Sequence, residues 1–215
     1  MSNGWLKESA ATGMRKLVHG EKSQRHPRQV PPWSAFLDVM AHIKLNGDLG
    51  SNPTLLDAGC GVGAYAWLVD DYYPDFQYRG CDISPSMIEY ARRDYGDRFF
   101  VADMLDLEQG ADVILVSSVI EACPLWRAAV RHLLTLDFQY LLLHRVRIWN
   151  DCSRESDESY HQMPLYGIST FIVFHNRDEL LDLIENAGGK VTRMLVYQME
   201  PQFNLCSLLI RRAET

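Results

Sequence analysis

The stretch TLLDAGCGVGAYA, residues 54–66, runs from a β-branched and aliphatic segment into an acidic residue and then into alternating glycines. Residues 54–58 predict a short buried strand, and a helix is expected over 63–72. Three glycines in the connecting loop allow a sharp turn and let a ligand approach the main chain. Free N–H groups at a helix start also attract negative charge. The stretch therefore predicts a ligand-binding strand–loop–helix unit.

Further strands and helices alternate on the C-terminal side of this unit. The predicted strands are 54–58, 77–81, 98–101, 112–116, 139–143, 190–198 and 204–210. Helices between the first five strands indicate βαβ units, a parallel sheet and right-handed crossovers. The strands are continuous apolar runs, as expected when helices cover both faces. The last two strands are joined by so short a connection that they must be antiparallel.

The ends and one long insertion stand apart from this alternation. Residues 1–32 carry six Lys or Arg and two Glu, which gives this segment a net charge of +4. Because the whole chain has a net charge of −7, the remaining residues have a net charge of −11. We expect an N-terminal basic arm over 1–32, either solvated or touching an anionic substrate, and one domain over 33–215. Residues 145–175 are aromatic-rich and interrupt the alternation, which predicts a lid or a substrate-binding loop.

Composition limits the function classes. The chain is 47% hydrophobic and 23% charged, which is typical of a soluble globular protein. It has neither an apolar run of roughly 20 residues, as a membrane helix needs, nor an apolar signal-peptide core, so we expect a cytoplasmic protein. The acidic charge of residues 33–215 argues against a general nucleic-acid-binding protein. The five scattered cysteines form no CxxC pair, which predicts reduced thiols and no metal site.

Two cofactor classes use a glycine loop of this kind: dinucleotides and S-adenosylmethionine. Asp82 follows the second strand and suits ribose hydroxyls in either case, because a carboxylate can accept from both. The added Gly63 after Asp57, the position of Asp103 after the third strand, and the closing antiparallel pair favour S-adenosylmethionine. A carboxylate at Asp103 can accept a hydrogen bond from the adenine amino group.

The chain resembles the class I S-adenosylmethionine-dependent methyltransferases over roughly residues 33–211. The matching segments are LLDAGCGVG (55–63), GCDISPSMIEYAR (80–92), VADMLDL (101–107), DVILVSSVIEAC (112–123) and HNRDELLDLIENAGGKV (175–191). The resemblance implies a Rossmann-like three-layer α/β sandwich with a seven-stranded, mostly parallel sheet whose last strand is inserted antiparallel. It also implies the cofactor S-adenosyl-L-methionine.

The resemblance implies a role for each of nine residues. Asp57, Gly59, Gly61 and Gly63 are expected near the methionine part of the cofactor, and Asp82 is expected to bind the ribose. Ile83, Asp103 and Met104 are expected at the adenine, and Ser117 beside the methionine part and the substrate. Simpler roles stay open: the glycines as a structural turn, Asp82 as a helix cap, Asp103 as a solvated loop residue, and Asp57 as a holder of the loop.

The acceptor side is less defined. Methyl transfer to a hydroxyl needs a general base, and His144, directly after the fifth strand, is the first candidate, with Glu121 and His161 as further catalytic candidates. Arg145 and Arg147 could bind a phosphate or carboxylate, or be surface charges. No Asn-Pro-Pro-Tyr or Asp-Pro-Pro-Tyr motif follows the fourth strand, which disfavours amino methylation of nucleobases.

We therefore expect a methyltransferase acting on a hydroxyl of a small sugar or natural-product-like metabolite, with an amine or carboxylate as further possibilities. Two alternatives remain within the fold: a cofactor- or partner-binding protein without catalysis, and an enzyme that methylates RNA or protein. A nicotinamide oxidoreductase is disfavoured by Asp103 and the terminal strand pair. The sequence predicts no oligomeric state.

Overall fold

The computed structural model describes residues 4–47, 49–163 and 166–213, with the backbone alone over 157–163. The described helices are α1 (Glu8–Gln24), α2 (Pro31–Asn46), α3 (Ala66–Tyr72), α4 (Pro85–Tyr95), α5 (Trp126–Leu133) and α6 (Arg177–Asn186). The described strands are β1 (Thr54–Ala58), β2 (Gln77–Asp82), β3 (Phe99–Val101), β4 (Val113–Ser117), β5 (Tyr140–Trp149), β6 (Asp157–Met163), β7 (Ile168–Phe174), β8 (Gly189–Met199) and β9 (Phe203–Arg212). In this part of the chain no helix is both long and apolar enough to cross a bilayer.

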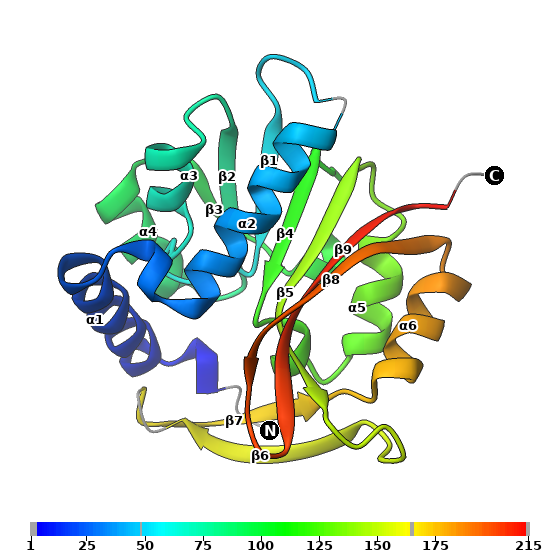
Figure 1. The fold of residues 1–215 in the computed structure, drawn as a ribbon. Coiled ribbons are helices and arrows are strands. Elements are labelled where there is room, and N and C mark those ends of the chain that lie inside the picture. Colours follow the sequence, from blue (N-terminus) through cyan, green and yellow to red (C-terminus); the bar gives the residue numbers. More distant parts are fainter. Residues whose placement is uncertain (1–3, 48, 164–165, 214–215) are drawn as a thin grey trace.

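Seven strands form one sheet in the order β3-β2-β1-β4-β5-β9-β8 (Figure 1). Strands β1 to β5 are parallel to one another, and β9 runs antiparallel to both of its neighbours, β5 and β8. The predicted fold, a mostly parallel seven-stranded sheet with the last strand inserted antiparallel, is confirmed. Because the parallel strands end at one edge, the loops after β1 to β5 gather there.

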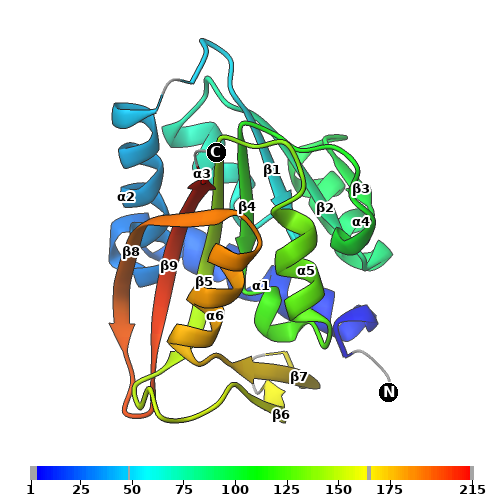
Figure 2. The same ribbon diagram turned by 90° about the vertical axis from the view of Figure 1, so that its right-hand side faces the viewer.

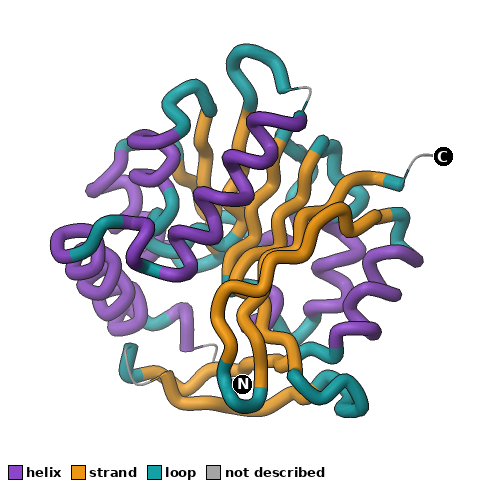
Figure 3. The backbone as a smooth tube through the Cα atoms, viewed as in Figure 1, coloured by secondary structure: helices purple, strands orange, loops and turns teal. Residues whose placement is uncertain are grey.

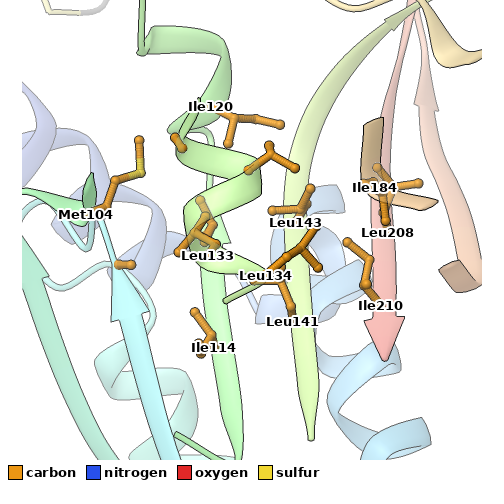
Figure 4. Close-up of a cluster of buried hydrophobic side chains, with 14 of the residues drawn as sticks. Met104, Ile114, Ile120, Leu133, Leu134, Leu141, Leu143, Ile184, Leu208 and Ile210 are labelled. Atoms are coloured by element: carbon orange, nitrogen blue, oxygen red, sulfur yellow. The ribbon is translucent and has the colours of Figure 1, made fainter. Parts of the chain in front are cut away.

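Helices cover both faces of this sheet, with α2 on one side and α5 and α6 on the other (Figure 2). Successive strand residues point to opposite faces, so Leu55 joins the core under α2 and α3, whereas Leu56 joins the core under α5 and α6. Figure 4 shows the second core, in which Ile184 of α6 lies beside Leu208 of β9. Burial on both faces explains why these strands read as continuous apolar runs.

Residues 145–175 are not the long loop that the sequence predicted. The strand β5 continues to Trp149 and pairs with β9 along this extension, after a β-bulge between Leu143 and Val146. The strands β6 and β7 then form an antiparallel pair outside the main sheet (Figure 3). The residues RVRI, 145–148, alternate polar and apolar side chains, and this period of two was the signal for a strand.

The N-terminal segment packs against the domain, so the alternative of a solvated arm is wrong. Its helix α1 buries Ala10 and Ala11 completely. Arg15 donates two hydrogen bonds of 2.8 Å to the carboxylate of Asp94 on α4, a bidentate ion pair. Part of the basic charge therefore fastens α1 to α4, beside the edge at which the parallel strands end (Figure 1).

Candidate cofactor and acceptor pocket

A cavity of about 410 Å³ lies at the carboxyl ends of β1 to β5, a size within the usual range for a small-molecule site. The segments after β1 to β4 contribute to its wall, and β5 contributes Arg145. The lining residues are Trp5, Met14, Asp57, Gly59, Cys60, Gly61, Ala64, Tyr65, Asp82, Ile83, Met87, Ala102, Asp103, Met104, Leu105, Ser117, Ser118, Val119, Ala122, Cys123, Pro124, Leu125, Arg145 and Tyr166.

The glycine loop forms one wall of the cavity, and its backbone adopts conformations that residues with a Cβ rarely adopt. Gly59 has a φ of 84° and Gly61 a φ of 55°, both in the left-handed region. A Cβ at Gly59 would lie 2.3 Å from Val119 Cγ2, and one at Gly61 would lie 2.7 Å from Met14 Sδ. Gly63 also has a positive φ but faces Tyr95 and Phe99 and does not line the cavity.

Asp82 ties the loop after β1 to the loop after β2. One carboxylate oxygen accepts from the backbone N–H of Gly61 at 2.9 Å, and the other accepts from that of Ser84 at 2.8 Å. Ser84 occupies the N-cap position of α4 but its side chain makes no capping bond, and Asp82 accepts from its backbone N–H instead. A carboxylate has about four lone-pair sites, so Asp82 can still accept from a ligand in the cavity.

Asp57 is fully buried beneath the loop and lines the cavity. The Tyr78 hydroxyl donates to its Oδ2 at 2.6 Å, while Oδ1 has no partner among the described residues. Burial raises the pKa of this carboxyl to about 7, and the Tyr78 bond offsets part of that effect. An unpaired, buried acceptor of this kind suits a cationic or hydrogen-bond-donating ligand group.

The remaining residues expected at the cofactor also line the cavity. Asp103 accepts from Leu105 N–H at 3.0 Å through Oδ1, and its Oδ2 accepts nothing from the described residues. Ile83 is 44% exposed, which leaves its apolar surface free for an adenine ring. Ser117 donates to the Tyr65 hydroxyl at 3.1 Å. Met104 is buried at the same wall.

The structure does not bring His144 to the cavity. Its ring is fully buried and does not line the cavity, and both nitrogens are occupied. Nδ1 lies 2.7 Å from Ser207 Oγ, and Nε2 lies 3.0 Å from the Pro32 carbonyl oxygen, to which it must donate. Burial lowers the pKa of His144 to about 3. The first candidate for the general base is therefore a neutral structural histidine, and the geometry does not support its catalytic role.

Glu121 is likewise buried behind the cavity wall and does not line it. Its Oε1 accepts from Arg147 Nη1 at 3.0 Å and from Ser118 Oγ at 3.1 Å. Burial raises the pKa of Glu121, and the arginine offsets only part of that rise. His161 pairs with Thr170 in the β6–β7 ladder, but its side chain lies outside the described part, so its role stays a prediction.

Of the lining residues that were not predicted at the site, four come from outside the segments that follow β1 to β4. Trp5 and Met14 come from the N-terminal segment, and Tyr166 follows β6; the Trp5 and Tyr166 rings pack with centroids 5.7 Å apart. Arg145 was assigned to a loop as a possible anion ligand, without a place in the site. No sequence signal joins Trp5 to Tyr166, because their contact depends on the tertiary fold. Among the described residues, no group of three His, Cys, Asp or Glu could hold a metal ion.

Comparison with known proteins agrees with this architecture. Residues 56–136 match the family model described as "Methyltransferase domain". Over 100 residues the chain is 34% identical to a malonyl-(acyl-carrier protein) O-methyltransferase of Anoxybacillus flavithermus, covering 45% of this chain and 39% of that protein. The chain thus spans about two-fifths of the length of this relative.

Solved structures share the fold over most of the chain. Magnesium protoporphyrin IX methyltransferase from Synechocystis PCC 6803, crystallised with S-adenosylmethionine, has a TM-score of 0.60 at 18% identity and covers 99% of this chain and 100% of that one. The (4+2)-cyclase SpnF has a TM-score of 0.66 at 14% identity and covers 89% of this chain and 86% of that one. The matched segment, the fold and the glycine loop after β1 lead to one conclusion: residues 56–136 are a methyltransferase domain, within a chain that has the fold of the class I S-adenosylmethionine-dependent methyltransferases.

Proposed function

We propose that this protein transfers the methyl group of S-adenosylmethionine to an oxygen atom of a small polar acceptor held in the cavity. The observation that carries the proposal is the set of polar groups at the strand ends. Asp103, Asp82, Asp57 and Ser117 follow or end β3, β2, β1 and β4, which are neighbours in the sheet. In this order, the four residues correspond to the parts of the cofactor that they are expected to contact: the adenine, the ribose, the methionine part and the transferred methyl group.

These residues fit the cofactor chemically. Asp82 would accept from the ribose hydroxyls while it holds Gly61, and the free Oδ2 of Asp103 would accept from the adenine amino group. Asp57, buried with an unpaired Oδ1, would favour a positive charge nearby. S-adenosylmethionine, when bound, supplies a methyl group on a positively charged sulfur. An acceptor oxygen attacking in line forms the C–O bond as the C–S bond breaks, and the sulfur keeps the electron pair.

The chain's contribution to this reaction is positioning and exclusion of water. Trp5, Met14 and Tyr166 add apolar and aromatic side chains to the wall, and the cavity is mostly apolar in its lining. A site of this volume favours a small acceptor over a folded macromolecule. The matched relative is named for O-methylation, which supports oxygen as the acceptor atom. A sugar or natural-product-like hydroxyl was the expectation from the sequence, and a carboxylate was a further possibility.

Calorimetric titration with S-adenosylhomocysteine and, separately, with NADH tests the cofactor. We expect micromolar binding of S-adenosylhomocysteine and none of NADH, followed by transfer of labelled methyl from S-adenosylmethionine to members of a small-acceptor panel. Binding without transfer to any acceptor would favour the alternative of a non-methylating member of the fold, as the cyclase illustrates. Binding of NADH alone would contradict the proposal.

The pKa of Asp57 predicts how cofactor affinity depends on pH. With a pKa of about 7, this carboxyl is largely protonated in mildly acid solution, and a nearby cation favours its ionised form. Binding of the sulfonium would then release a proton, so affinity rises with pH until the carboxyl is already ionised. We expect the affinity for S-adenosylmethionine, relative to S-adenosylhomocysteine, to rise about 10-fold between about pH 5.5 and 7.5 and then to level off.

S-adenosylhomocysteine is the matched control, because it lacks the positive sulfur and keeps every other ionisable group. Asp57→Asn should flatten the pH dependence of the ratio of the two affinities. Isothermal titrations in buffers of different ionisation enthalpy would count the released protons. An identical pH dependence for both ligands with the unaltered protein would rule out ionisation of Asp57 by the sulfonium.

A further inference from the structure

We infer that Arg145 binds a carboxylate group of the acceptor, so that the substrate class is a small carboxylic acid anion. This inference rests on the proposed methyl transfer and names its substrate. Arg145 lines the cavity, and its Nε is buried without a hydrogen-bond partner among the described residues. A guanidinium has five donors in a planar fork that matches a carboxylate, and a buried donor without a partner costs free energy.

The backbone at Arg145 is built to present this side chain. Arg145 has a φ of 60°, a left-handed conformation that is uncommon outside glycine, and it sits in the β-bulge between Leu143 and Val146. A bulge leaves one residue unpaired and redirects its side chain, and bulges are frequent next to active sites. The preceding His144 is locked by Ser207 and the Pro32 carbonyl, which fixes the bulge from beneath. The strained residue is thus held toward the cavity.

The charges around Arg145 leave a positive excess at this end of the cavity. Arg145 and Arg147 both lie near the buried Glu121, whose Oε1 is within 3.0 Å of Arg147 Nη1. No ion pair joins Arg145 to Glu121 or to any other described carboxylate. The nearby hydroxyls of Tyr65 and Tyr166 carry no charge to balance it. One buried carboxylate between two guanidinium groups leaves a net charge of +1 for a ligand to neutralise.

The place of Arg145 in the sheet separates it from the cofactor groups. Asp57 and Asp82 belong to β1 and β2 and Asp103 follows β3, whereas Arg145 belongs to β5, on the far side of β4. Neighbouring strands are about 4.8 Å apart, so β5 lies roughly 10 Å from the strand that carries the glycine loop. The cavity is therefore acidic at the end that suits the cofactor and basic at the opposite end, where the acceptor would lie.

The lack of a histidine or lysine among the described lining residues supports the same substrate class. The described lining residues include no His or Lys, and the candidates His144 and Glu121 lie behind the wall. A hydroxyl acceptor must lose a proton during transfer, whereas a carboxylate is already ionised at neutral pH. Its oxygen can form the C–O bond with no proton to remove, and the product is a neutral methyl ester. The lining carboxylates Asp57, Asp82 and Asp103 are assigned to the cofactor, so the buried guanidinium at the other end suits an acceptor that needs no base.

The test measures methyl transfer from labelled S-adenosylmethionine to malonate, succinate, benzoate and the monothioester of malonate, beside their amides and a set of monosaccharides. Methyl esters release their label in alkali and methyl ethers do not, so the bond formed is identified directly. We expect alkali-labile product from at least one carboxylate and none from its amide. Arg145→Ala should lower kcat/KM for that carboxylate by about 100-fold or more, and Arg145→Lys by less.

Two measurements separate this inference from the proposed function. Affinity for S-adenosylhomocysteine should change by less than about 3-fold in Arg145→Ala, and this binding also verifies that the variant is folded. Arg131 is an exposed arginine on α5, so Arg131→Ala should leave both the cofactor affinity and kcat/KM for the carboxylate unchanged. A comparable loss of cofactor affinity in Arg145→Ala would assign the residue to the cofactor instead. Alkali-stable methylation of a monosaccharide that persists in Arg145→Ala would overturn the inference and leave the proposed function standing.

If no acceptor of the panel is methylated, binding decides. Protein saturated with S-adenosylhomocysteine is titrated with malonate and with benzoate, and we expect binding that Arg145→Ala abolishes and Arg131→Ala retains. Absence of carboxylate binding, or equal binding by Arg145→Ala, would overturn the inference. Failure of the unaltered protein to bind S-adenosylhomocysteine at all would instead contradict the proposed function on which it rests.

Discussion

Asp82→Ala is expected to weaken S-adenosylhomocysteine binding by about 100-fold or more, which is the largest effect of one side chain on the cofactor. The carboxylate accepts from Gly61 N–H at 2.9 Å and from Ser84 N–H at 2.8 Å. Its removal leaves two backbone donors of the site unpaired and deletes the proposed ribose acceptor. Calorimetric titration, with thermal unfolding to verify the fold, measures the loss.

Asp82→Asn and Asp106→Ala are the controls for this result. The amide keeps one acceptor oxygen and the shape of the side chain, so we expect an intermediate loss of about 10-fold. Asp106 is exposed in the short 3-10 helix after Asp103 and does not line the cavity, so its replacement should leave the affinity unchanged. Binding by Asp82→Ala as tight as that of the unaltered protein would show that the loop binds the cofactor without this carboxylate.

Glu121→Ala is expected to destabilise the folded protein by about 3–5 kcal/mol, because it removes one partner of a buried ion pair. The side chain of Glu121 is 1% exposed and that of Arg147 is 16% exposed, so water cannot replace the lost partner. The midpoint of thermal unfolding should fall by about 6–20 °C for a chain of this length. Differential scanning calorimetry or far-UV circular dichroism during heating would measure the shift.

Glu89→Ala provides a matched comparison for this variant. Glu89 pairs with Arg93 four residues later on α4, and these side chains are 73% and 56% exposed. Exposed pairs contribute little because water screens them, so the midpoint should move by less than about 2 °C. Equal small shifts for Glu89→Ala and Glu121→Ala would mean that the buried pair contributes no more than a surface pair.

The sequence was most informative where packing and local conformation agree. Strand 54–58 was predicted with the bounds that the structure has, because its apolar run ends at a glycine that has a positive φ. One of the segments that carry the resemblance, 175–191, contains α6, and the Asn176 side chain caps this helix by accepting from the Glu179 N–H. The residues expected at the cofactor follow strands that the sheet order brings together, so eight of those nine line one cavity and Gly63 alone does not.

The acceptor end was less predictable because tertiary contacts determine it. His144 has the residue type and strand position of a base, but burial and two hydrogen bonds from distant segments remove it from the cavity. Arg145 faces the cavity through a left-handed backbone conformation that the sequence gives no means to anticipate. Trp5 and Met14 reach the site because α1 docks on α4, and a polar N-terminal segment with glycines and prolines does not disclose that contact.

The ion pair between Arg15 and Asp94 has a consequence for control of the enzyme. Met14 and Trp5 form part of the cavity wall, so the free energy of ligand binding includes that of keeping α1 in place. By thermodynamic reciprocity, a change that weakens the docking of α1 also lowers the affinity for the ligand, and ligand binding stabilises the docked helix by the same free energy. His19 also lies 2.8 Å from Asp94, at the outer surface. A partner that competes for this single carboxylate could therefore tune occupancy of the pocket without entering it.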